Sequence, residues 1–290
     1  MKVLLFGANG QVGREIVSAA ASQSDLNLKA LTRADADLMR EDAGADTIRR
    51  AEPDLVINAA AWTQVDKAES ERAAARRLNS LAPAELAAAA LAIGARFIHL
   101  STDYVFPGSQ AGEPLTEDAE TGPVNVYGAT KLEGERLTLK EHPDAIIVRT
   151  SWVYSSHGAN FVQTMLRLAE TKKEVSIVED QIGGPTPANA IAKACLAVAR
   201  RSDGAGGLFH FQGAPPASWA DFAAAIFAAS GKNMKINRIK SQEYETPAQR
   251  PLFTVLNCSK IRREYGVEQP DWRRDLPATI EKIVTRGAGC

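Results

Sequence analysis

The 290-residue chain has only three cysteines, Cys195, Cys258 and Cys290. They lie far apart, are odd in number and form no Cys-x-x-Cys pair, so the sequence predicts neither a disulfide framework nor a cysteine-based metal site. Unpaired cysteines of this kind are typical of proteins kept in a reducing compartment. We therefore expect a cytoplasmic protein.

Long hydrophobic runs are also absent. The apolar run at residues 2–6 stops at Gly7, which is too early for a signal peptide, and a buried strand explains it better. The alanine-rich stretch 82–93 is interrupted by Pro83 and Glu85. No segment approaches the roughly 20 apolar residues that span a bilayer, so we expect a soluble protein.

Neither sign of charge is in excess. The 34 basic and 35 acidic residues nearly cancel, and no long run of either sign occurs, so nothing indicates nucleic acid or a membrane as the main partner. Internal repeats and low-complexity linkers are missing too. We expect lobes that pack tightly, with any site in the cleft between them.

What is present is an alternation of short apolar runs and longer helical patterns. Strand-like runs occupy residues 2–6, 28–32, 54–61, 96–102 and 145–154, and helical patterns occupy residues 11–23, 81–94 and 127–142. This alternation predicts an α/β fold with a doubly wound, Rossmann-like parallel sheet. A hydrophobic content of 45% is ample for its core.

The second half of the chain is less regular. Helices are predicted at 160–171, 188–200 and 219–230, strands at 175–178 and 207–212, a loop at 179–187, and one closing helix after further loop-like sequence. We therefore assign residues 1–153 to a dinucleotide-binding Rossmann domain, to which segments around 188–213 return. Residues 154–290 then form mainly a smaller, irregular substrate lobe.

A glycine-rich turn follows the first strand directly. Gly7, Gly10 and Gly13 recur at three-residue spacing before a helix, and bare backbone there lets a pyrophosphate approach the amides of a helix N-terminus. The alternative is a plain tight turn. The position of the three glycines after the first buried strand of an alternating chain favours dinucleotide binding.

The second strand should end near the adenosine ribose. It ends in Arg33, which would pair with a 2′-phosphate and so indicates NADP, although a solvated loop arginine explains the residue nearly as well. Asp37 and Leu38 follow where a loop could reach the adenine.

Two further strand ends carry small or hydroxyl side chains. Residues 59–61 are three alanines that would let backbone lie against a cofactor, or that simply pack closely. Ser101 and Thr102 end the strand at 96–102, at the edge where open α/β sheets bind ligands. Hydroxyl groups at that edge can hold a carbonyl oxygen.

Tyr127 and Lys131 lie four residues apart in a predicted helix, which puts both on one face. An ammonium near a phenol lowers the pKa of that phenol. Spacing alone favours an ordinary amphipathic helix, so the context decides. Trp152, just after a strand, offers an aromatic plane to a sugar ring or packs in the core.

Together these motifs resemble the extended branch of the short-chain dehydrogenase/reductase superfamily. Within it, the chain is similar over nearly its whole length to the dTDP-4-dehydrorhamnose reductase family. The resemblance rests on "FGANGQVG", "NAAAWTQVDKAE", "STDYVFPG", "NVYGATKLEGE", "RTSWVY", "NFVQTMLRLA", "DQIGGPT", "LNCSKI" and "PDW", in this order and spacing.

The resemblance implies reduction of the C4 keto group of dTDP-4-dehydro-β-L-rhamnose to dTDP-β-L-rhamnose by NADPH or NADH. It makes Tyr127 the proton donor, has Lys131 hold the nicotinamide ribose and lower the phenol pKa, and has Thr102 bind the reacting oxygen. The other implied contacts are Gly10, Gln11 and Val12 with the pyrophosphate, Asp37 and Leu38 with the adenine side, Ala61, Trp62, Thr63 and Ser101 with the cofactor, and Asp103 and Trp152 with the sugar.

Some activities of similar proteins are disfavoured. Dehydratases resembling this chain carry a glutamate where Tyr104 stands, and the run 64–69 resembles the reductases rather than the epimerases. Two alternatives remain: a reductase of another dTDP-4-keto-6-deoxysugar, and a non-catalytic regulatory subunit like the β-subunit of methionine adenosyltransferase. The intact catalytic positions argue against the second.

Some family members bind Mg²⁺ through glutamates at a dimer interface. Glu15 stands in one matching place, but Asn189 replaces the second carboxylate, and a hard cation prefers several carboxylate oxygens. The sequence therefore predicts no tightly bound metal. The resemblance leaves a homodimer open.

Overall fold

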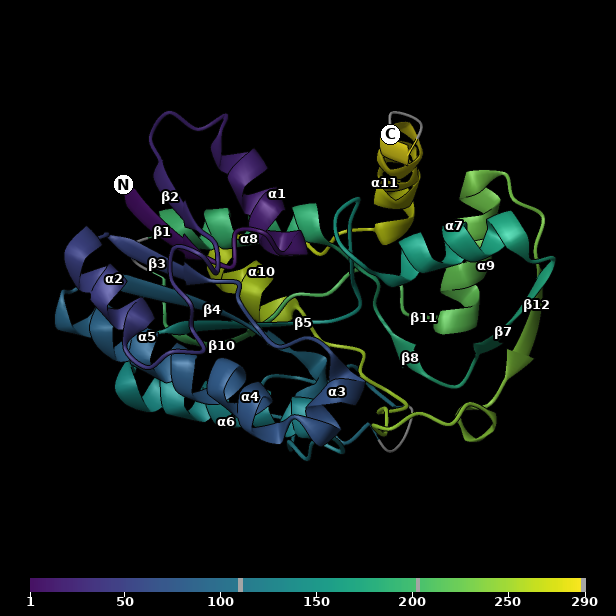
Figure 1. Cartoon of the computed structure of the whole chain (residues 1–290), viewed down its shortest axis with the longest axis horizontal. Helices are drawn as coiled ribbons and strands as arrows, with labels where there is room; N and C mark the ends of the chain where they lie inside the picture. Colours follow the sequence, from purple (N-terminus) through teal and green to yellow (C-terminus); the bar gives the residue numbers. More distant parts are fainter. Residues whose placement is uncertain (109–111, 202–203, 288–290) are drawn as a thin grey trace.

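The computed structural model describes residues 1–108, 112–201 and 204–287, so Cys290 lies outside the described residues. Figure 1 shows a larger part built around a central sheet and a smaller part beside it. Within the described residues, no helix combines the length and the apolar composition needed to cross a membrane.

The larger part contains six strands that all run parallel, in the order β10-β5-β4-β3-β1-β2. The strands are β1 (Lys2–Phe6), β2 (Asn27–Leu31), β3 (Leu55–Asn58), β4 (Arg96–Thr102), β5 (Ile146–Thr150) and β10 (Gly207–His210). Strands β3 and β5 are buried along their whole length, which explains their continuous apolar runs. The predicted doubly wound parallel sheet is confirmed.

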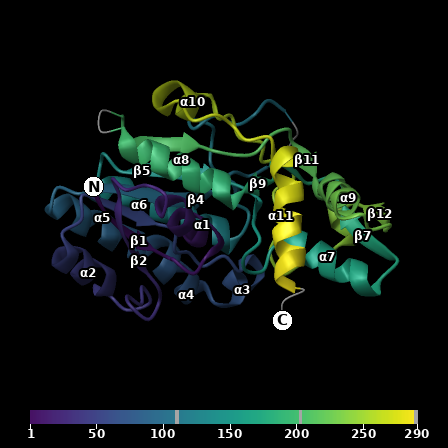
Figure 2. The ribbon, with the colours of Figure 1, turned by 90° about the horizontal axis from the view of Figure 1, so that it is seen from above.

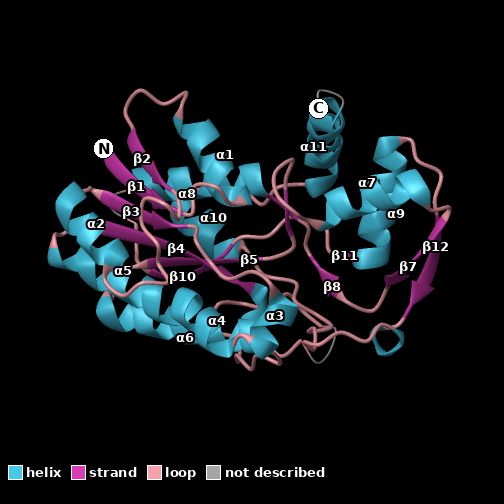
Figure 3. Cartoon of the chain, in the orientation of Figure 1, coloured by secondary structure: helices cyan, strands magenta, loops and turns pink. Residues whose placement is uncertain are grey.

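Helices cover both faces of this sheet (Figure 3). One face carries α1 (Gln11–Ala20), α8 (Ala188–Arg200) and α10 (Ser259–Tyr265), and the other carries α2 (Ala43–Ala51), α5 (Ala82–Ala92) and α6 (Val126–Glu141). The order of the strands in the sheet reverses between β1 and β3, because β2 lies on one side of β1 and the later strands lie on the other. In open α/β sheets, ligands bind outside the carboxyl ends of the strands at such a reversal.

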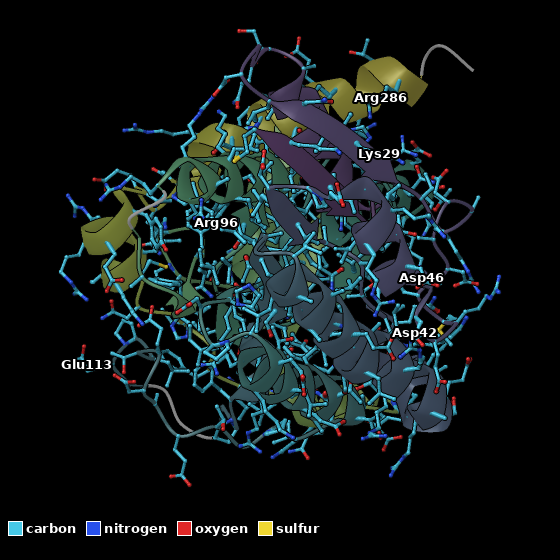
Figure 4. The ribbon with its side chains drawn as sticks, turned by 90° about the vertical axis from the view of Figure 1, so that its left-hand side faces the viewer. Lys29, Asp42, Asp46, Arg96, Glu113 and Arg286 are labelled. Carbon is cyan, nitrogen blue, oxygen red and sulfur yellow. The ribbon has the colours of Figure 1, made fainter. Side chains whose placement is uncertain are left out.

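Shorter elements complete the larger part near α6. They are α3 (Val65–Ser70), α4 (Arg72–Arg76), a π-helical turn η1 (Arg77–Leu81) and a 3₁₀ turn η2 (Asp103–Val105). On the other face, Arg96 of β4, labelled in Figure 4, donates hydrogen bonds to the carbonyls of Val198 and Ala199 and so satisfies the last turn of α8.

The smaller part has its own apolar core, formed by α7 (Phe161–Thr171), α9 (Trp219–Ser230), α11 (Trp272–Gly287) and the parallel pair β7 (Glu174–Val178) and β12 (Lys235–Ile239). Figure 2 shows α11 between the two parts. Four two-residue strands, β6 (Val153–Tyr154), β8 (Ile182–Gly183), β9 (Thr186–Pro187) and β11 (Ala217–Ser218), and the 3₁₀ turn η3 (Ser241–Glu243) lie in the connections.

Three sequence predictions are wrong in this region. Strand β12 was not predicted, the expected loop 179–187 contains β8 and β9, and two helices, α10 and α11, stand where one closing helix was expected. Strand β12 is half-exposed and pairs with β7 from far along the chain, so its residues carry no continuous apolar run.

Candidate active site

A cavity of about 1190 Å³ lies at the carboxyl ends of β1, β3, β4 and β5. Residues of the larger part form most of its wall, and Gly158, Asn160 and Trp219 close it from the side of the smaller part. The cavity therefore lies at the carboxyl edge of the sheet, where the sequence predicted a ligand site, and at the point where the strand order reverses.

The glycine turn forms one wall of the cavity. Gly7 has a φ of +83°, and a Cβ there would lie 2.6 Å from the amide nitrogen of Ala60, so no other residue fits. A Cβ on Gly13 would lie 2.1 Å from the Gly7 carbonyl oxygen. Gly13 does not line the cavity; its role is to let α1 approach the turn.

Helix α1 begins with an uncapped N-terminus at this wall. Its N-cap, Gly10, has no side chain to accept from the first amides, and its first turn carries no acidic residue. Gln11 and Val12 line the cavity next to it. Free amides and the positive end of the helix dipole are a suitable site for a pyrophosphate.

Arg33, Asp37 and Leu38 line the far end of the same cavity. Nε of Arg33 lies 3.3 Å from Oδ1 of Asp37, and the arginine side chain is 78% exposed. An exposed pair of this kind holds its partners weakly. The guanidinium is therefore available to an incoming anion, while Leu38 offers a buried apolar surface.

The segment after β3 supplies the middle of the wall through Ala61, Trp62 and Thr63. Asn79 of η1 holds this backbone: its Oδ1 accepts from the amide of Trp62 at 2.8 Å, and its Nδ2 donates to the carbonyl of Trp62 at 3.1 Å. Two hydrogen bonds from one buried amide group fix the backbone against which a cofactor would lie.

The end of β4 brings two hydroxyl side chains, those of Ser101 and Thr102, to the cavity. Ser101 donates from Oγ to Oε1 of the buried Glu135 at 2.5 Å. Thr102 donates from Oγ1 to Oδ1 of Asp103 at 3.1 Å and accepts from the amide of Tyr104. Both cavity-lining hydroxyl groups on β4 thus donate to a carboxyl group, that of Ser101 to Glu135 and that of Thr102 to Asp103.

Asp103 is a buried carboxyl group with an unused acceptor. Its Oδ2 has no hydrogen-bond partner. Burial raises the pKa of Asp103 to about 7, although hydrogen bonds with Thr254 and Thr102 lower it. A buried acceptor without a partner at a cavity wall suits a hydroxyl group of a ligand.

Tyr127 and Lys131 reach the cavity from the first turns of α6. Asn125 caps this helix by accepting from the amide of Gly128 at 2.7 Å, which fixes where the helix begins. Nζ of Lys131, 1% exposed, donates to the Leu100 carbonyl at 2.7 Å and lies 3.1 Å from Nε2 of His99. Burial lowers the pKa of Lys131 to about 8, opposed by the charge of Glu135.

The expectation that Lys131 lowers the pKa of Tyr127 is not met. Burial raises the pKa of Tyr127 to about 12, against a lowering by the hydrogen bond with Thr102. The reason is that Nζ of Lys131 is directed at His99 and Leu100. The phenol is therefore fully protonated at neutral pH, which is the form that a proton donor requires.

Trp152 forms an aromatic platform at the cavity. Its φ is +44°, and its ring stacks on that of Trp219 with centroids 3.5 Å apart and an angle of 6°. Phe161 packs against Trp219 at 4.6 Å. The sequence did not predict Trp219, because an aromatic residue in the first turn of an amphipathic helix is usually a core residue.

The cavity brings together nearly all of the predicted site residues. Those lining it are Gly7, Gly10, Gln11, Val12, Arg33, Asp37, Leu38, Ala61, Trp62, Thr63, Ser101, Thr102, Asp103, Tyr127, Lys131 and Trp152. Only Gly13 of the predicted set lies behind the wall. The buried side chains His99 and Glu135, which contact Lys131 and Ser101, had no signal in the sequence.

The two residues weighed for a metal have different surroundings. Oε1 of Glu15 lies 3.6 Å from Nε2 of His157, whereas Asn189 lines a separate cavity of about 310 Å³. In the part of the chain that the structure describes, no three His, Cys, Asp or Glu side chains form a metal-binding group. That no metal binds tightly stays a prediction.

Comparison with known proteins shows the family of the chain. The model of the RmlD substrate binding domain family matches residues 1–285. A dTDP-4-dehydrorhamnose reductase of Sinorhizobium fredii is 40% identical, over 99% of this chain and 99% of its own length.

Solved structures give the same result. A dTDP-4-dehydrorhamnose reductase of Clostridium acetobutylicum superposes with a TM-score of 0.92 at 38% identity, over 97% of this chain and 99% of its own. The enzyme of Bacillus anthracis in complex with NADP gives a TM-score of 0.90 at 31% identity, over 97% and 99%.

Proposed function

The chain belongs to the family of dTDP-4-dehydrorhamnose reductases, and from this premise we propose that it reduces the C4 keto group of dTDP-4-dehydro-β-L-rhamnose to dTDP-β-L-rhamnose. NADPH or NADH is the reductant in this proposal. The observation that carries it is the convergence of the glycine turn with Thr102, Tyr127 and Lys131 in one cavity. The NADP bound by the Bacillus anthracis relative supports the cofactor class.

The residues of the cavity fit a dinucleotide. The uncapped N-terminus of α1 would hold the pyrophosphate, and the backbone near Ala61 and Trp62 would lie along its middle. Arg33 would pair with a 2′-phosphate. A reduced nicotinamide, when bound, supplies a hydride to the carbonyl carbon.

The proton for the carbonyl oxygen comes from Tyr127. Burial keeps its phenol protonated, and the hydroxyl of Thr102 stands beside it to hold the same oxygen. Lys131, anchored on the Leu100 carbonyl, would hold the nicotinamide ribose. The chain thereby supplies a proton donor and an oxygen-binding hydroxyl at one point of the cavity.

The sugar would bind between Asp103 and the paired rings of Trp152 and Trp219. The free Oδ2 of Asp103 can accept from a ring hydroxyl, and the stacked rings offer an apolar surface. Tyr104 stands where a dehydratase would need an acid or base. Burial raises the pKa of Tyr104, so it stays neutral, and this supports simple reduction.

We also place the protein in the cytoplasm. Cys195 and Cys258 are buried thiols outside any disulfide, and burial raises the pKa of Cys195 to about 12, so that it remains a thiol. This chemistry is consistent with a reducing compartment.

The direct test mixes purified protein with dTDP-4-dehydrorhamnose and either NADPH or NADH and follows nicotinamide absorbance. Oxidation with at least one cofactor is expected, and none with either would refute the proposal. Arg33→Ala should raise the KM for NADPH about tenfold while changing that for NADH little, because only NADPH carries the 2′-phosphate.

Arg49→Ala is the matched control, because Arg49 is also an exposed arginine paired with a nearby aspartate but lies outside the cavity. It should leave both KM values unchanged. If Arg33→Ala raised the KM for NADPH and for NADH equally, Arg33 would not be the residue that binds the 2′-phosphate. Faster reduction of a different dTDP-4-keto-6-deoxysugar would reassign the substrate.

A further inference from the structure

Behind Lys131, two side chains that do not line the cavity form a hydrogen-bonded row. The register of β3 and β4 places Asn58 directly opposite His99, and both residues are fully buried. Nδ2 of Asn58 lies 3.1 Å from Nδ1 of His99, and Nε2 of His99 lies 3.1 Å from Nζ of Lys131. The row runs from the sheet interior to the active-site lysine.

The direction of each hydrogen bond in this row follows from one backbone contact. Oδ1 of Asn58 accepts from the amide of Ala60 at 3.1 Å, which fixes the orientation of the Asn58 carboxamide. Its NH₂ group therefore faces His99 and donates to Nδ1. A neutral imidazole carries a single proton, so that of His99 must lie on Nε2.

His99 is a neutral ring in these surroundings. Burial lowers the pKa of His99 well below its ordinary value, and the charge of Lys131 lowers it further, against a smaller raising effect of a hydrogen bond with the Asn58 backbone. The Nε2–H group therefore points at Nζ of Lys131. An ammonium has three donors and no acceptor, so it opposes this N–H, whereas a neutral amine accepts from it and still donates to the Leu100 carbonyl.

We propose that Asn58 fixes His99 as a hydrogen-bond donor and that His99 thereby favours the amine form of Lys131 over its ammonium form. His99 is a positioning residue in this scheme, because it acts on the reaction only through Lys131. The ammonium form would require His99 to carry its proton on Nδ1 and the Asn58 carboxamide to turn, which would break its bond with Ala60.

The other charged groups around Lys131 do not override this contact. Glu135, on the same helix, favours the ammonium, but Arg149 of β5 donates to both its oxygens at 2.9 and 2.7 Å, and the two side chains are each 2% exposed. Tyr127 of α6 stays neutral while Lys131 titrates, because burial raises the pKa of Tyr127 to about 12. Asp103 of η2, whose pKa burial raises to about 7, ionises at lower pH than Lys131, but its Oδ1 accepts from the hydroxyl of Thr102.

The remaining elements packed on α6 direct their charges elsewhere. Arg76 of α4 pairs with Glu133, Arg77 of η1 pairs with Glu85 of α5, Asp66 of α3 pairs with Arg250, and Glu69 of α3 accepts from the amide of Val126. His99 is thus the side chain in direct contact with Nζ.

The first test uses the ligand-free protein and therefore does not depend on the proposed function. Nitrogen NMR of ¹⁵N-histidine-labelled protein reports which ring nitrogen of each of the four histidines carries the proton. Proton on Nε2 of His99 is expected. Proton on Nδ1 would overturn the proposal, whether or not the protein reduces a keto sugar.

Carbon NMR of ¹³C-lysine-labelled protein then measures the titration of Lys131, assigned by its loss in Lys131→Met. In His99→Gln the amide oxygen can accept from an ammonium, so the titration midpoint of Lys131 should rise by about one pH unit or more, a tenfold change in the protonation equilibrium. His142→Gln is the matched control, because His142 is also a buried histidine, and its Nε2 lies 3.1 Å from the carbonyl oxygen of Ala95 rather than beside Lys131.

A second variant keeps the test decisive if His99→Gln does not fold. Asn58→Asp places an acceptor beside Nδ1, so the His99 proton should move to Nδ1 and the Lys131 midpoint should again rise. The same midpoint in wild type, His99→Gln and Asn58→Asp would refute the proposal. An unmoved His99 proton in Asn58→Asp would also refute it.

The catalytic readout rests on the proposed function, in which the reaction uses the ammonium of Lys131. Turnover should then fall as pH rises through the Lys131 midpoint, and His99→Gln should move this alkaline limb to higher pH by the shift that NMR measures. The phenol of Tyr127, with a pKa of about 12, titrates too high to produce that limb. If His99→Gln shifted the Lys131 midpoint but not the alkaline limb of the pH–rate profile, the role of Lys131 in catalysis would be refuted, whereas the effect of His99 on Lys131 would stand.

Discussion

In the proposed reaction, the phenol of the half-buried Tyr127 is the proton donor. Tyr127→Phe should lower kcat by roughly 10² to 10⁴ and leave cofactor affinity nearly unchanged, because general acid catalysis contributes about that much. Single-turnover absorbance and cofactor titration measure the two effects separately.

Tyr104→Phe is the control for this substitution. Its ring packs edge-on against that of Tyr127, with centroids 5.7 Å apart, but burial keeps its phenol neutral. A few-fold change in kcat is expected. If the two variants lost activity equally, the proton donor would have to be sought elsewhere.

For single residues, the sequence predicts chemical roles better than it predicts which side chains lie in contact. The spacing of Tyr127 and Lys131 and the hydroxyls at the end of a strand were recognisable, because regular elements place such residues at known positions. The contact of Lys131 with His99 and the stack of Trp152 on Trp219 depend on which strands and lobes become neighbours. No local pattern encodes that, and the pKa of Tyr127 was mispredicted for the same reason.

Among the elements, α6 is held unusually close to η1. A Cβ on Gly134 would lie 2.0 Å from the carbonyl oxygen of Asn79. Gly134→Ala should lower the free energy of unfolding by about 1 to 3 kcal/mol, since the displacement of packed backbone outweighs the better helix propensity of alanine. Urea denaturation measures the change.

Displacement of Asn79 should also weaken cofactor binding, because Asn79 holds the backbone of Trp62 at the cavity wall. A raised KM for the cofactor is therefore expected in Gly134→Ala. Arg136→Ala, on the exposed face of α6, should stay within about 0.5 kcal/mol of wild type. A Gly134→Ala protein as stable as this control would contradict the close packing.

Some of the elements that the sequence predicted carry continuous apolar or small residues. Strands β3 and β5 and helix α5 have long apolar or alanine-rich runs, so their type and place follow directly. Strand β12 alternates weakly between exposed and half-buried positions, and the two-residue strands are shorter than any periodicity. Their existence depends on pairing partners distant in sequence.

For the whole molecule, the segment that returns from the smaller part toward α10 is fastened to α3. Arg250 donates to both oxygens of Asp66, at 2.6 and 2.8 Å, and the amide of Ala248 donates to Oδ1. Asp66→Asn should lower the free energy of unfolding by about 1 kcal/mol, reduced by the partial exposure of the pair. Chemical denaturation at neutral pH measures it.

The pH dependence of this effect has a fixed sign. The hydrogen bond from Arg250 holds the pKa of Asp66 below its ordinary value, so its contribution is present above the pKa of the unfolded chain and is lost as pH falls through the lower, folded value. Asp46→Asn, in an exposed pair with Arg49, is the control and should change stability little. If Asp66→Asn and Asp46→Asn lowered the free energy of unfolding equally at neutral pH, the pair of Asp66 and Arg250 would stabilise the fold no more than an exposed pair does.

The doubly wound sheet could be predicted from alternation alone. Helix α8 and strand β10 lie on the large sheet, within the segments around 188–213 for which the sequence predicted a return to the Rossmann domain. Helix α10 also packs there, but its short amphipathic pattern would suit either core, so only the packed structure places it.

The aromatic wall of the cavity gives the protein an optical property. Three of its four tryptophans, Trp62, Trp152 and Trp219, line the cavity, and two of these rings are stacked 3.5 Å apart. Most of the indole rings of the chain therefore lie at the site, and the stacked pair is close enough to share excitation. The tryptophan emission of the unlabelled protein should therefore change when a ligand occupies the cavity.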